Sequence, residues 1–94
     1  MEVVQTVPIL RIFDVAKAKE FCLDYLGFRV DWEHRFEPGL PLYMQISKYG
    51  CVLHLSEHYG DATPGATVFL RVTGKLMQLT DPFGNRLRFN EDLK

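Results

Sequence analysis

The sequence predicts an α+β domain in which a βαβββ module is followed by a shortened second module of three strands. Three observations support this fold class. The 94 residues are 47% apolar and 24% charged, as in one ordinary globular domain. Only one segment has helical periodicity, and the remainder divides into short strands separated by Gly and Pro. We expect one domain over residues 1–94, with modules at 1–56 and 67–94 joined by a linker at 57–66.

The first two elements are a strand and the helix. Residues 3–12 are rich in Val, Ile and Leu, and Pro8 within them is typical of a sheet edge. Asp14 is a good helix N-cap, and Gly27 stands where a left-handed residue ends a helix. Between them, apolar residues recur at spacings of three and four, which predicts one buried helix face: Val15, Ala18, Phe21, Cys22, Tyr25 and Leu26.

The other elements are strands. We predict them at residues 29–36, 42–47, 51–56, 67–72, 76–80 and 86–90. In the strand at 29–36, alternation places Val30, Trp32 and His34 on one face. Residues 81–85 (Asp-Pro-Phe-Gly-Asn) predict a hairpin turn, because Pro fixes φ and Gly permits positive φ.

Composition excludes several classes of partner. The net charge is −1 and no run of like charge occurs, so we expect no nucleic-acid binding. The N-terminus lacks a secretory pattern, and no apolar stretch is long enough for a membrane helix. Cys22 and Cys51 have no metal-ligand spacing, which favours reduced thiols. A cytoplasmic protein without a membrane partner is therefore expected.

Three segments, taken in order, carry a family resemblance. They are residues 7–15 (Val-Pro-Ile-Leu-Arg-Ile-Phe-Asp-Val) with Phe21 and Tyr25-Leu26-Gly27-Phe28, then residues 53–58, and finally residues 79–89. Together they resemble the glyoxalase, bleomycin-resistance and dioxygenase (vicinal oxygen chelate) superfamily over nearly the whole chain. The resemblance implies a curved mixed sheet that cups a ligand. In the enzymes of the family, His, Gln or Glu side chains hold a divalent metal in that cup.

The metal-ligand positions of the family are poorly matched. Three of them fall on Val7, Thr67 and Arg88, and the fourth lies on the strand that contains His54. Valine offers no lone pair, threonine is a weak ligand and arginine repels a cation. We therefore expect no metal, no cofactor and no catalytic residues, so enzyme activity is not the favoured interpretation.

The resemblance instead favours the bleomycin-resistance-like branch, whose dimers sequester bulky cationic, aromatic-bearing antibiotics in clefts between subunits. Aromatic faces and carboxylates suit such ligands. The expected ligand-binding residues are Trp32, Phe36, Tyr43, Phe69 and Glu57. Further negative potential could come from Asp31, Glu33, Glu37 and Asp61.

The chain departs from the family after residue 72. Relatives have a helix and a strand here, but only Thr73-Gly74-Lys75 joins Val72 to Leu76. A parallel crossover needs about a dozen residues, so we predict a tight reversal instead. Without the second helix, Val68, Leu70 and Val72 should lack a cover within the subunit. That predicts a homodimer or higher homo-oligomer that completes the sheet, with strand exchange (a domain swap) left open.

Two other functions stay open. One is a metal-dependent glyoxalase- or dioxygenase-type enzyme, and the other is a truncated, self-associating scaffold without a ligand. His54 and His58 are four residues apart, but on a strand and its exit this spacing does not predict a metal pair. Arg88 could bind an anion or form a salt bridge with a neighbouring acid.

Overall fold

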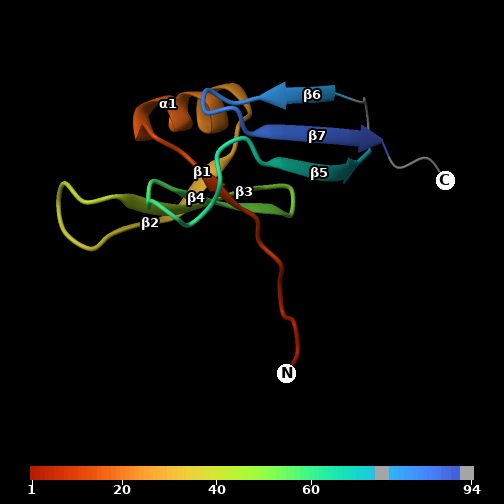
Figure 1. Ribbon diagram of the computed structural model, residues 1–94. Helices are drawn as coiled ribbons and strands as arrows, with labels where there is room; N and C mark the ends of the chain where they lie inside the picture. Colours follow the sequence, from red (N-terminus) through yellow and green to blue (C-terminus); the bar gives the residue numbers. More distant parts are fainter. Residues whose placement is uncertain (74–76, 92–94) are drawn as a thin grey trace.

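The computed structural model of the protein, which describes residues 1–73 and 77–91, contains one helical segment and seven strands in two sheets (Figure 1). The elements in order are β1 (Ile9–Arg11), α1 (Val15–Lys19), η1 (Glu20–Tyr25), β2 (Arg29–Arg35), β3 (Leu42–Lys48), β4 (Cys51–Ser56), β5 (Thr67–Val72), β6 (Met77–Thr80) and β7 (Arg86–Glu91). Sheet A has the order β1-β4-β3-β2, and sheet B has the order β5-β7-β6. The predicted α+β class, a βαβββ module followed by three strands, is confirmed. Its mixed strands form two sheets, however, and not one.

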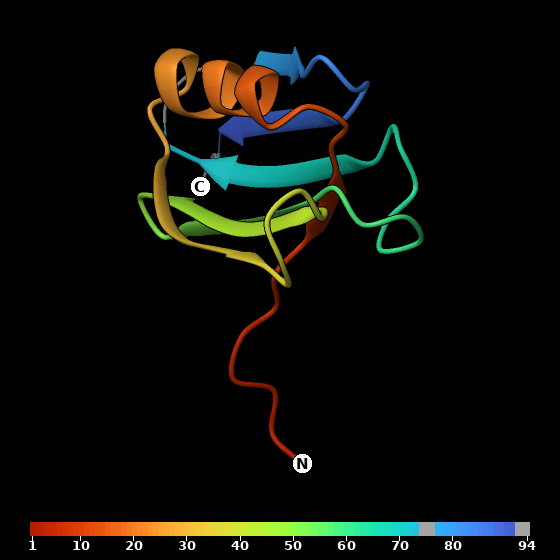
Figure 2. The ribbon, with the colours of Figure 1, turned by 90° about the vertical axis from the view of Figure 1, so that its left-hand side faces the viewer.

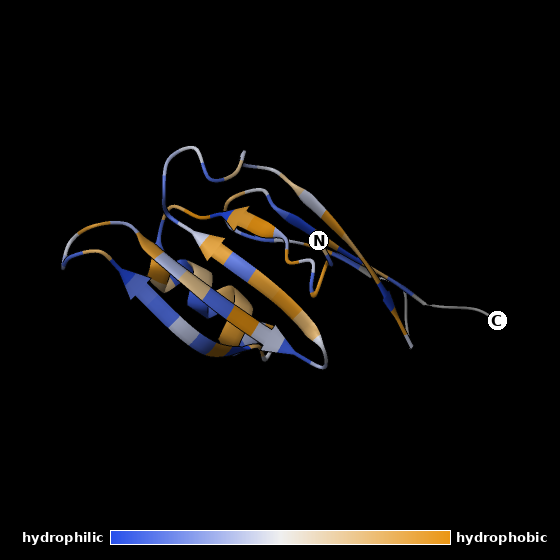
Figure 3. Cartoon of the chain, turned by 90° about the horizontal axis from the view of Figure 1, so that it is seen from below, coloured by the Kyte–Doolittle hydropathy of each residue, from blue (hydrophilic) through white to orange (hydrophobic). Residues whose placement is uncertain are grey.

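Sheet A has one covered face and one open face. The helical segment packs on the covered face (Figure 2), where Leu10, Met44 and Leu55 are buried. Because side chains alternate along a strand, Tyr43, Gln45 and His54 lie on the opposite face. We call this opposite side the open face. Figure 3 views the molecule from that side, with the helix behind the strands and hydrophilic and hydrophobic residues alternating along them.

The helix begins and ends at the predicted residues. The Asp14 carboxylate accepts a hydrogen bond from the backbone N–H of Lys17 at 3.0 Å, and Gly27 ends the helix at φ +80°. From Glu20 to Tyr25 the segment widens into a π-helix, in which the Leu26 N–H bonds the Phe21 carbonyl. Apolar spacing predicted the helix but contains no signal for this widening.

The first strand is shorter than predicted. Only residues 9–11 of the expected 3–12 form β1, paired in parallel with β4. The chain before them extends away from the body on the side of sheet A opposite the helix (Figure 1), and Val3 and Val4 are exposed. Residue composition favoured a strand here, but the described chain offers no neighbour with which residues 3–7 pair.

In sheet B, β5 and β7 are parallel, and β6 is antiparallel to β7. The predicted reversal of direction between β5 and β6 is therefore present, but the expectation of a tight turn between neighbouring strands is wrong. β7 lies between the two strands, so β5 and β6 are not neighbours in the sheet. The joining residues 74–76 lie outside the described residues.

One core serves both modules. Leu87 of β7 is buried in the same cluster as Leu10 and Leu55, and Val68 and Leu70 are half-buried against that cluster. The expectation that the apolar side of β5 lacks a cover within the subunit is thus only partly met. The core of the first module covers it, because sheet B lies beside the single helix (Figure 1).

Asn85 joins the modules at the turn before β7. Its side chain is buried, its amide nitrogen donates to the Arg11 carbonyl at 2.8 Å, and its amide oxygen accepts from the Ala66 N–H at 3.2 Å. The predicted turn at 81–85 is confirmed: Asp81 accepts hydrogen bonds from the Phe83 and Asn85 N–H groups, and Gly84 has φ +85°.

Candidate functional site

The open face of sheet A carries an aromatic pair. The Trp32 and Tyr43 rings lie nearly parallel, with centroids 5.9 Å apart and an interplanar angle of 11°. Trp32, the only tryptophan, remains 42% exposed. Both residues were predicted to bind ligand, and the structure brings them together. They offer an outward-facing aromatic surface on which a planar group can stack.

A one-residue bulge at Asp31 places Trp32 on this face. Val30 lies opposite Ile46 on the covered side, and without a bulge Trp32 would lie opposite Met44 on the same side. The register shift between Val30 and Trp32 pairs Trp32 with Gln45 instead, which turns the indole to the open face. The prediction that Val30 shares a face with Trp32 and His34 is wrong for this reason.

Hydrogen bonds link the aromatic pair to the bulge. The Tyr43 hydroxyl lies 2.7 Å from His54 Nδ1, and His54 Nε2 lies 2.9 Å from Gln45 Oε1. Gln45 Nε2 donates to Asp31 Oδ2 at 3.0 Å, and Ser47 Oγ donates to Asp31 Oδ1 at 2.9 Å. The His54 ring also meets the Trp32 and Tyr43 rings edge-on, at 5.3 and 5.1 Å. We call Tyr43, His54, Gln45 and Asp31 the open-face chain.

Three groups in this region have shifted pKa values. Hydrogen bonds from Gln45 and Ser47 lower the pKa of Asp31, which therefore remains a carboxylate at neutral pH. Partial burial lowers the pKa of His54, which favours the neutral imidazole. Partial burial and the nearby Asp61 carboxylate raise the pKa of Tyr43. The open face thus combines a protonated phenol and a neutral imidazole with carboxylates on either side.

The other predicted ligand residues lie elsewhere. Phe36 is 80% exposed after the end of β2, and Phe69 is 54% exposed on the outer side of sheet B. Among the described residues, neither ring pairs with Trp32 or Tyr43. The Glu57 carboxylate accepts a hydrogen bond from the Leu42 N–H at 2.9 Å and lies 3.7 Å from the Arg35 guanidinium. Those two contacts already engage it in holding the start of β3.

Sequence reasoning did not assign a role to Gln45 or His54. A signal was present: Tyr43, Gln45 and Ser47 alternate with Leu42, Met44 and Ile46, which indicates a polar face opposite a core face. What was missing was the register, which pairs Gln45 with His54 across β3 and β4.

The donor set does not fit the metal of the family's enzymes. Val7 has no donor atom, and Arg88 donates its Nε–H to Gln78 Oε1 at 3.1 Å. Among the described residues, the acceptor of Arg88 is thus an amide. Over residues 1–73 and 77–91, no three His, Cys, Asp or Glu side chains gather as a cation cage. Val7 and Arg88 thus do not fit the divalent metal that the family's enzymes hold at these positions.

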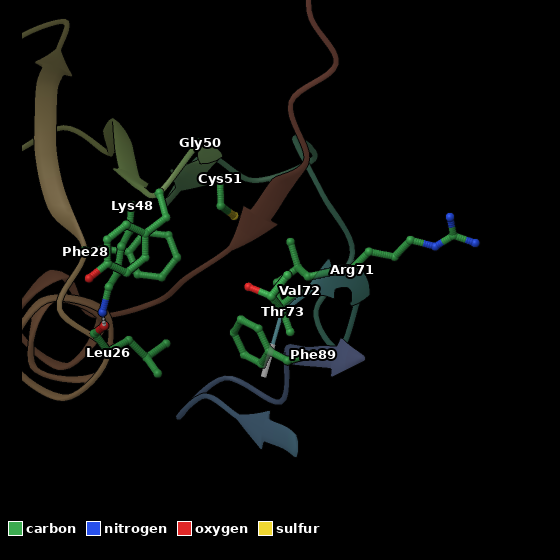
Figure 4. Close-up of a pocket in the computed structure, with 11 residues that line it drawn as sticks. Leu26, Phe28, Lys48, Gly50, Cys51, Arg71, Val72, Thr73 and Phe89 are labelled. Carbon is green, nitrogen blue, oxygen red and sulfur yellow. Dashed lines mark hydrogen bonds between the residues drawn. The ribbon is translucent and has the colours of Figure 1, made fainter. Parts of the chain in front are cut away.

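A cavity of about 500 Å³ lies between the modules (Figure 4). Leu26, Phe28 and Cys51 line one side, and Leu70 and Phe89 line the other. Lys48 at its edge donates to the Leu26 carbonyl at 2.7 Å. Neither this cavity nor the other two main cavities of the described chain includes Trp32, Tyr43 or His54. The open face of a single subunit therefore lies outside these three cavities.

The helical segment in the described part of the chain lacks the length and apolar character that a bilayer span requires. Comparison with protein families gives one decisive match: the model of a glyoxalase superfamily protein matches residues 1–76. The chain belongs to the glyoxalase superfamily. No curated protein matches it closely enough to count as a relative.

Several solved structures share the fold of this chain. An antibiotic-binding protein from Streptomyces sp. CB03234, TnmS3, matches with a TM-score of 0.71 and 19% identity, over 99% of this chain and 100% of that one. A bleomycin-binding protein complexed with bleomycin has a TM-score of 0.69 and 18% identity, over 97% and 100%. A bleomycin resistance determinant encoded on the transposon Tn5 has a TM-score of 0.67 and 17% identity, over 97% and 100%. At such identities these matches establish the fold alone.

Proposed function

We propose that the protein binds a planar, cationic aromatic small molecule on the open face of sheet A and sequesters it in a cleft that a second copy of the chain completes. The observation that carries this proposal is the exposed, parallel pair of Trp32 and Tyr43 rings. A side chain the size of tryptophan is usually well buried, so its exposure beside a second ring favours a role in stacking.

The charges around the pair favour a cation. Asp31 is held ionised within hydrogen-bonding distance of Gln45, and the Asp61 carboxylate is near enough to raise the pKa of Tyr43. A cationic ring stacked on Trp32 would lie close to these carboxylates and to the negative face of the indole. Three structural neighbours are named for antibiotic or bleomycin binding or for bleomycin resistance, which supports the same class of ligand.

A second copy of the chain would enclose the open face and so complete a ligand cleft. In one subunit Trp32, Tyr43 and His54 lie outside the three main cavities, and the exposed apolar chain with Val3 and Val4 extends on this same side of sheet A (Figure 1). An unpaired, apolar extended segment is suited to adding to a strand edge of another subunit. We therefore infer a homodimer, with the N-terminal segment as the part available for exchange.

Titration of the full-length protein with metal-free bleomycin tests the ligand class, with Trp32 fluorescence as the signal. We expect saturable quenching in the wild type and its loss in Tyr43→Ala, with calorimetry as a second measurement. Phe69→Ala is the control, because Phe69 lies on the outer side of the other sheet. If millimolar bleomycin produces no heat and no quenching, bleomycin is excluded as the ligand. An equal loss of binding in Phe69→Ala would move the site away from the open face.

Light scattering after gel filtration tests the assembly. A dimer of the full chain that becomes monomeric when residues 1–7 are removed supports the exchange. A dimer that survives this truncation would contradict the role of the N-terminal segment but not dimer formation. A stable monomer at micromolar concentration would contradict the proposed cleft.

A further inference from the structure

The open-face chain has a fixed direction of hydrogen bonding. Asp31 is ionised and can only accept, so the NH₂ end of Gln45 has to face it. This orientation turns the Gln45 carbonyl oxygen toward His54 Nε2, which must then carry a hydrogen. In a neutral imidazole the other nitrogen, Nδ1, is an acceptor. The Tyr43 hydroxyl therefore donates its single hydrogen to Nδ1.

The direction has a consequence for whatever lies against Tyr43. With its hydrogen engaged by His54, the hydroxyl oxygen presents only lone pairs to the open face. We propose that Asp31, Gln45 and His54 are positioning residues that make Tyr43 a hydrogen-bond acceptor toward the ligand, so that the site selects an aromatic cation carrying an N–H donor. This rests on the proposed function, because it names the chemistry of the ligand on that same face.

Protonation of His54 reverses the direction. The imidazolium carries hydrogens on both nitrogens, so Nδ1 donates to Tyr43 and the hydroxyl hydrogen turns outward. The site then presents a donor and an added positive charge, and both disfavour a cation. The pKa of His54 is below its ordinary value, so binding of a cationic probe should be retained through neutral pH and lost only as the pH falls through the lowered pKa.

Other charged groups lie near the open-face chain, and they determine which control variants the pH experiment needs. The titratable and charged groups that lie on or beside this face are Arg29, Asp31 and His34 on β2, Tyr43 on β3, Arg11 on β1, and His58 and Asp61 after β4. Arg11 is directed to the Ile12 and Ser56 carbonyls, and Arg29 lies 3.3 Å from Asp31. His34 and His58 are the two other histidines on the neighbouring segments, so each needs its own variant as a control.

Nitrogen-15 NMR of the free protein tests the direction without any ligand. We expect His54 as the Nε2–H tautomer in the wild type. In Asp31→Asn, the new amide can donate to the Gln45 oxygen and let Gln45 turn, so a measurable share of the Nδ1–H tautomer should appear. A wild-type Nδ1–H tautomer overturns the inference, as does an unchanged tautomer in Asp31→Asn. The fold of each variant is checked in the same spectra.

Two matched probes test the selection. 1-Naphthylmethylammonium and its N,N,N-trimethyl analogue share ring and charge, but only the first has N–H donors. The two probes differ in hydration, so selectivity is defined as the Kd of the trimethyl analogue divided by the Kd of the primary ammonium. The measured quantity is this selectivity in the wild type divided by the selectivity in Tyr43→Phe. We expect about tenfold, the usual effect of one hydrogen bond to a charged group. Asp31→Asn should reduce it.

The outcomes separate this inference from the proposed function. If both probes bind and the ratio is unchanged in Tyr43→Phe, the selection is wrong although the stacking site stands. If neither probe binds while His54 is the Nε2–H tautomer, the proposed function fails and the hydrogen-bond direction survives. The pH midpoint of probe binding should move in His54→Gln and stay in His34→Gln. A midpoint that follows His58→Gln would overturn the role of His54.

Discussion

The two modules of this chain are built on one plan and differ in what each retains. In each module the first strand pairs in parallel with the last strand: β1 with β4 in sheet A, and β5 with β7 in sheet B. The last strand also pairs in antiparallel fashion with the strand before it, β4 with β3 and β7 with β6. Sheet A adds β2 and a helix, and sheet B has neither among the described residues. The first module therefore buries its own covered face, and the second uses the core of the first.

Among the described residues, the second module has no counterpart of the helix and β2 of the first. In the first module, the helix runs from the end of β1 back past the sheet, and β2 then runs in the opposite direction. Together they return the chain to the end of the sheet at which β1 finished, which is where β3 begins. Removing such a pair leaves the chain at the end where β6 begins, and β5-β7-β6 keeps the order of β1-β4-β3. The missing pair corresponds to the helix and β2 of the first module. β2 is also the strand that carries Trp32 and Asp31, so only the first module has the residues of the candidate site.

The largest expected effect comes from matched core truncations in the two modules. Leu55 is 1% exposed beneath the helix, whereas Leu70 is half-buried at the edge of the same core. We expect Leu55→Ala to lower the free energy of unfolding by about 3–4 kcal/mol and Leu70→Ala by about 1–2 kcal/mol. Urea unfolding followed by circular dichroism measures both. An equal loss at Leu70 would show that β5 is buried in an assembly, and the dependence on protein concentration would then identify the interface.

The joint between the modules is the next target. Asn85→Ala removes the donor to the Arg11 carbonyl and the acceptor for the Ala66 N–H, and leaves both backbone groups buried without that partner. We expect a loss of about 2–3 kcal/mol in the same unfolding experiment. Asn85→Asp retains an acceptor but sets a carboxylate beside Asp81, so it should not rescue stability. Wild-type stability in Asn85→Ala would mean that apolar packing, by Leu87 together with Val68 and Leu70, is sufficient to hold the modules together.

Two glycines with similar backbone angles separate strain from crowding. Gly27 follows the helix at φ +80°, and Gly84 lies in the β6–β7 turn at φ +85°. An added Cβ at Gly27 would lie 2.9 Å from Lys48 Nζ, which bonds the Leu26 carbonyl, whereas at Gly84 the nearest atom is 3.9 Å away. Positive φ costs an alanine about 1 kcal/mol at either site. Gly27→Ala should lower the melting temperature more than Gly84→Ala, because it also disturbs the hydrogen bond from Lys48 to the Leu26 carbonyl. Equal melting temperatures would show that Lys48 moves aside freely.

The sequence predicted most of the fold because local signals decide it. Asp14 and Gly27 gave the helix its ends, and the Asp81–Asn85 turn gave the last hairpin its position. What could not be predicted depends on pairing at a distance. The bulge at Asp31, the place of β7 between β5 and β6, and the contact of His54 with Tyr43 are all set by register. Trp32 and Tyr43 were found from residue type alone, whereas Gln45 and His54 needed the register.

The smallest expected effect is the loss of stability at alkaline pH, which compares a thiol in the helix, Cys22, with a thiol in sheet A, Cys51. Burial raises the pKa of the Cys22 thiol from its ordinary 9.0 to about 12, so the folded state binds this proton more tightly than the unfolded chain. The resulting stability is fully present below pH 9 and is lost as pH rises from there toward 12, at no more than about 1.4 kcal/mol per pH unit. In Cys22→Ala, unfolding between pH 9 and 10.5 should depend less on pH than in the wild type. Cys51→Ala is the matched comparison: burial raises the pKa of that thiol too, but it is only half-buried at the start of β4, so its removal should change the pH slope less. An identical pH slope in Cys22→Ala would mean that the helix opens locally and admits the thiolate to water before sheet A unfolds.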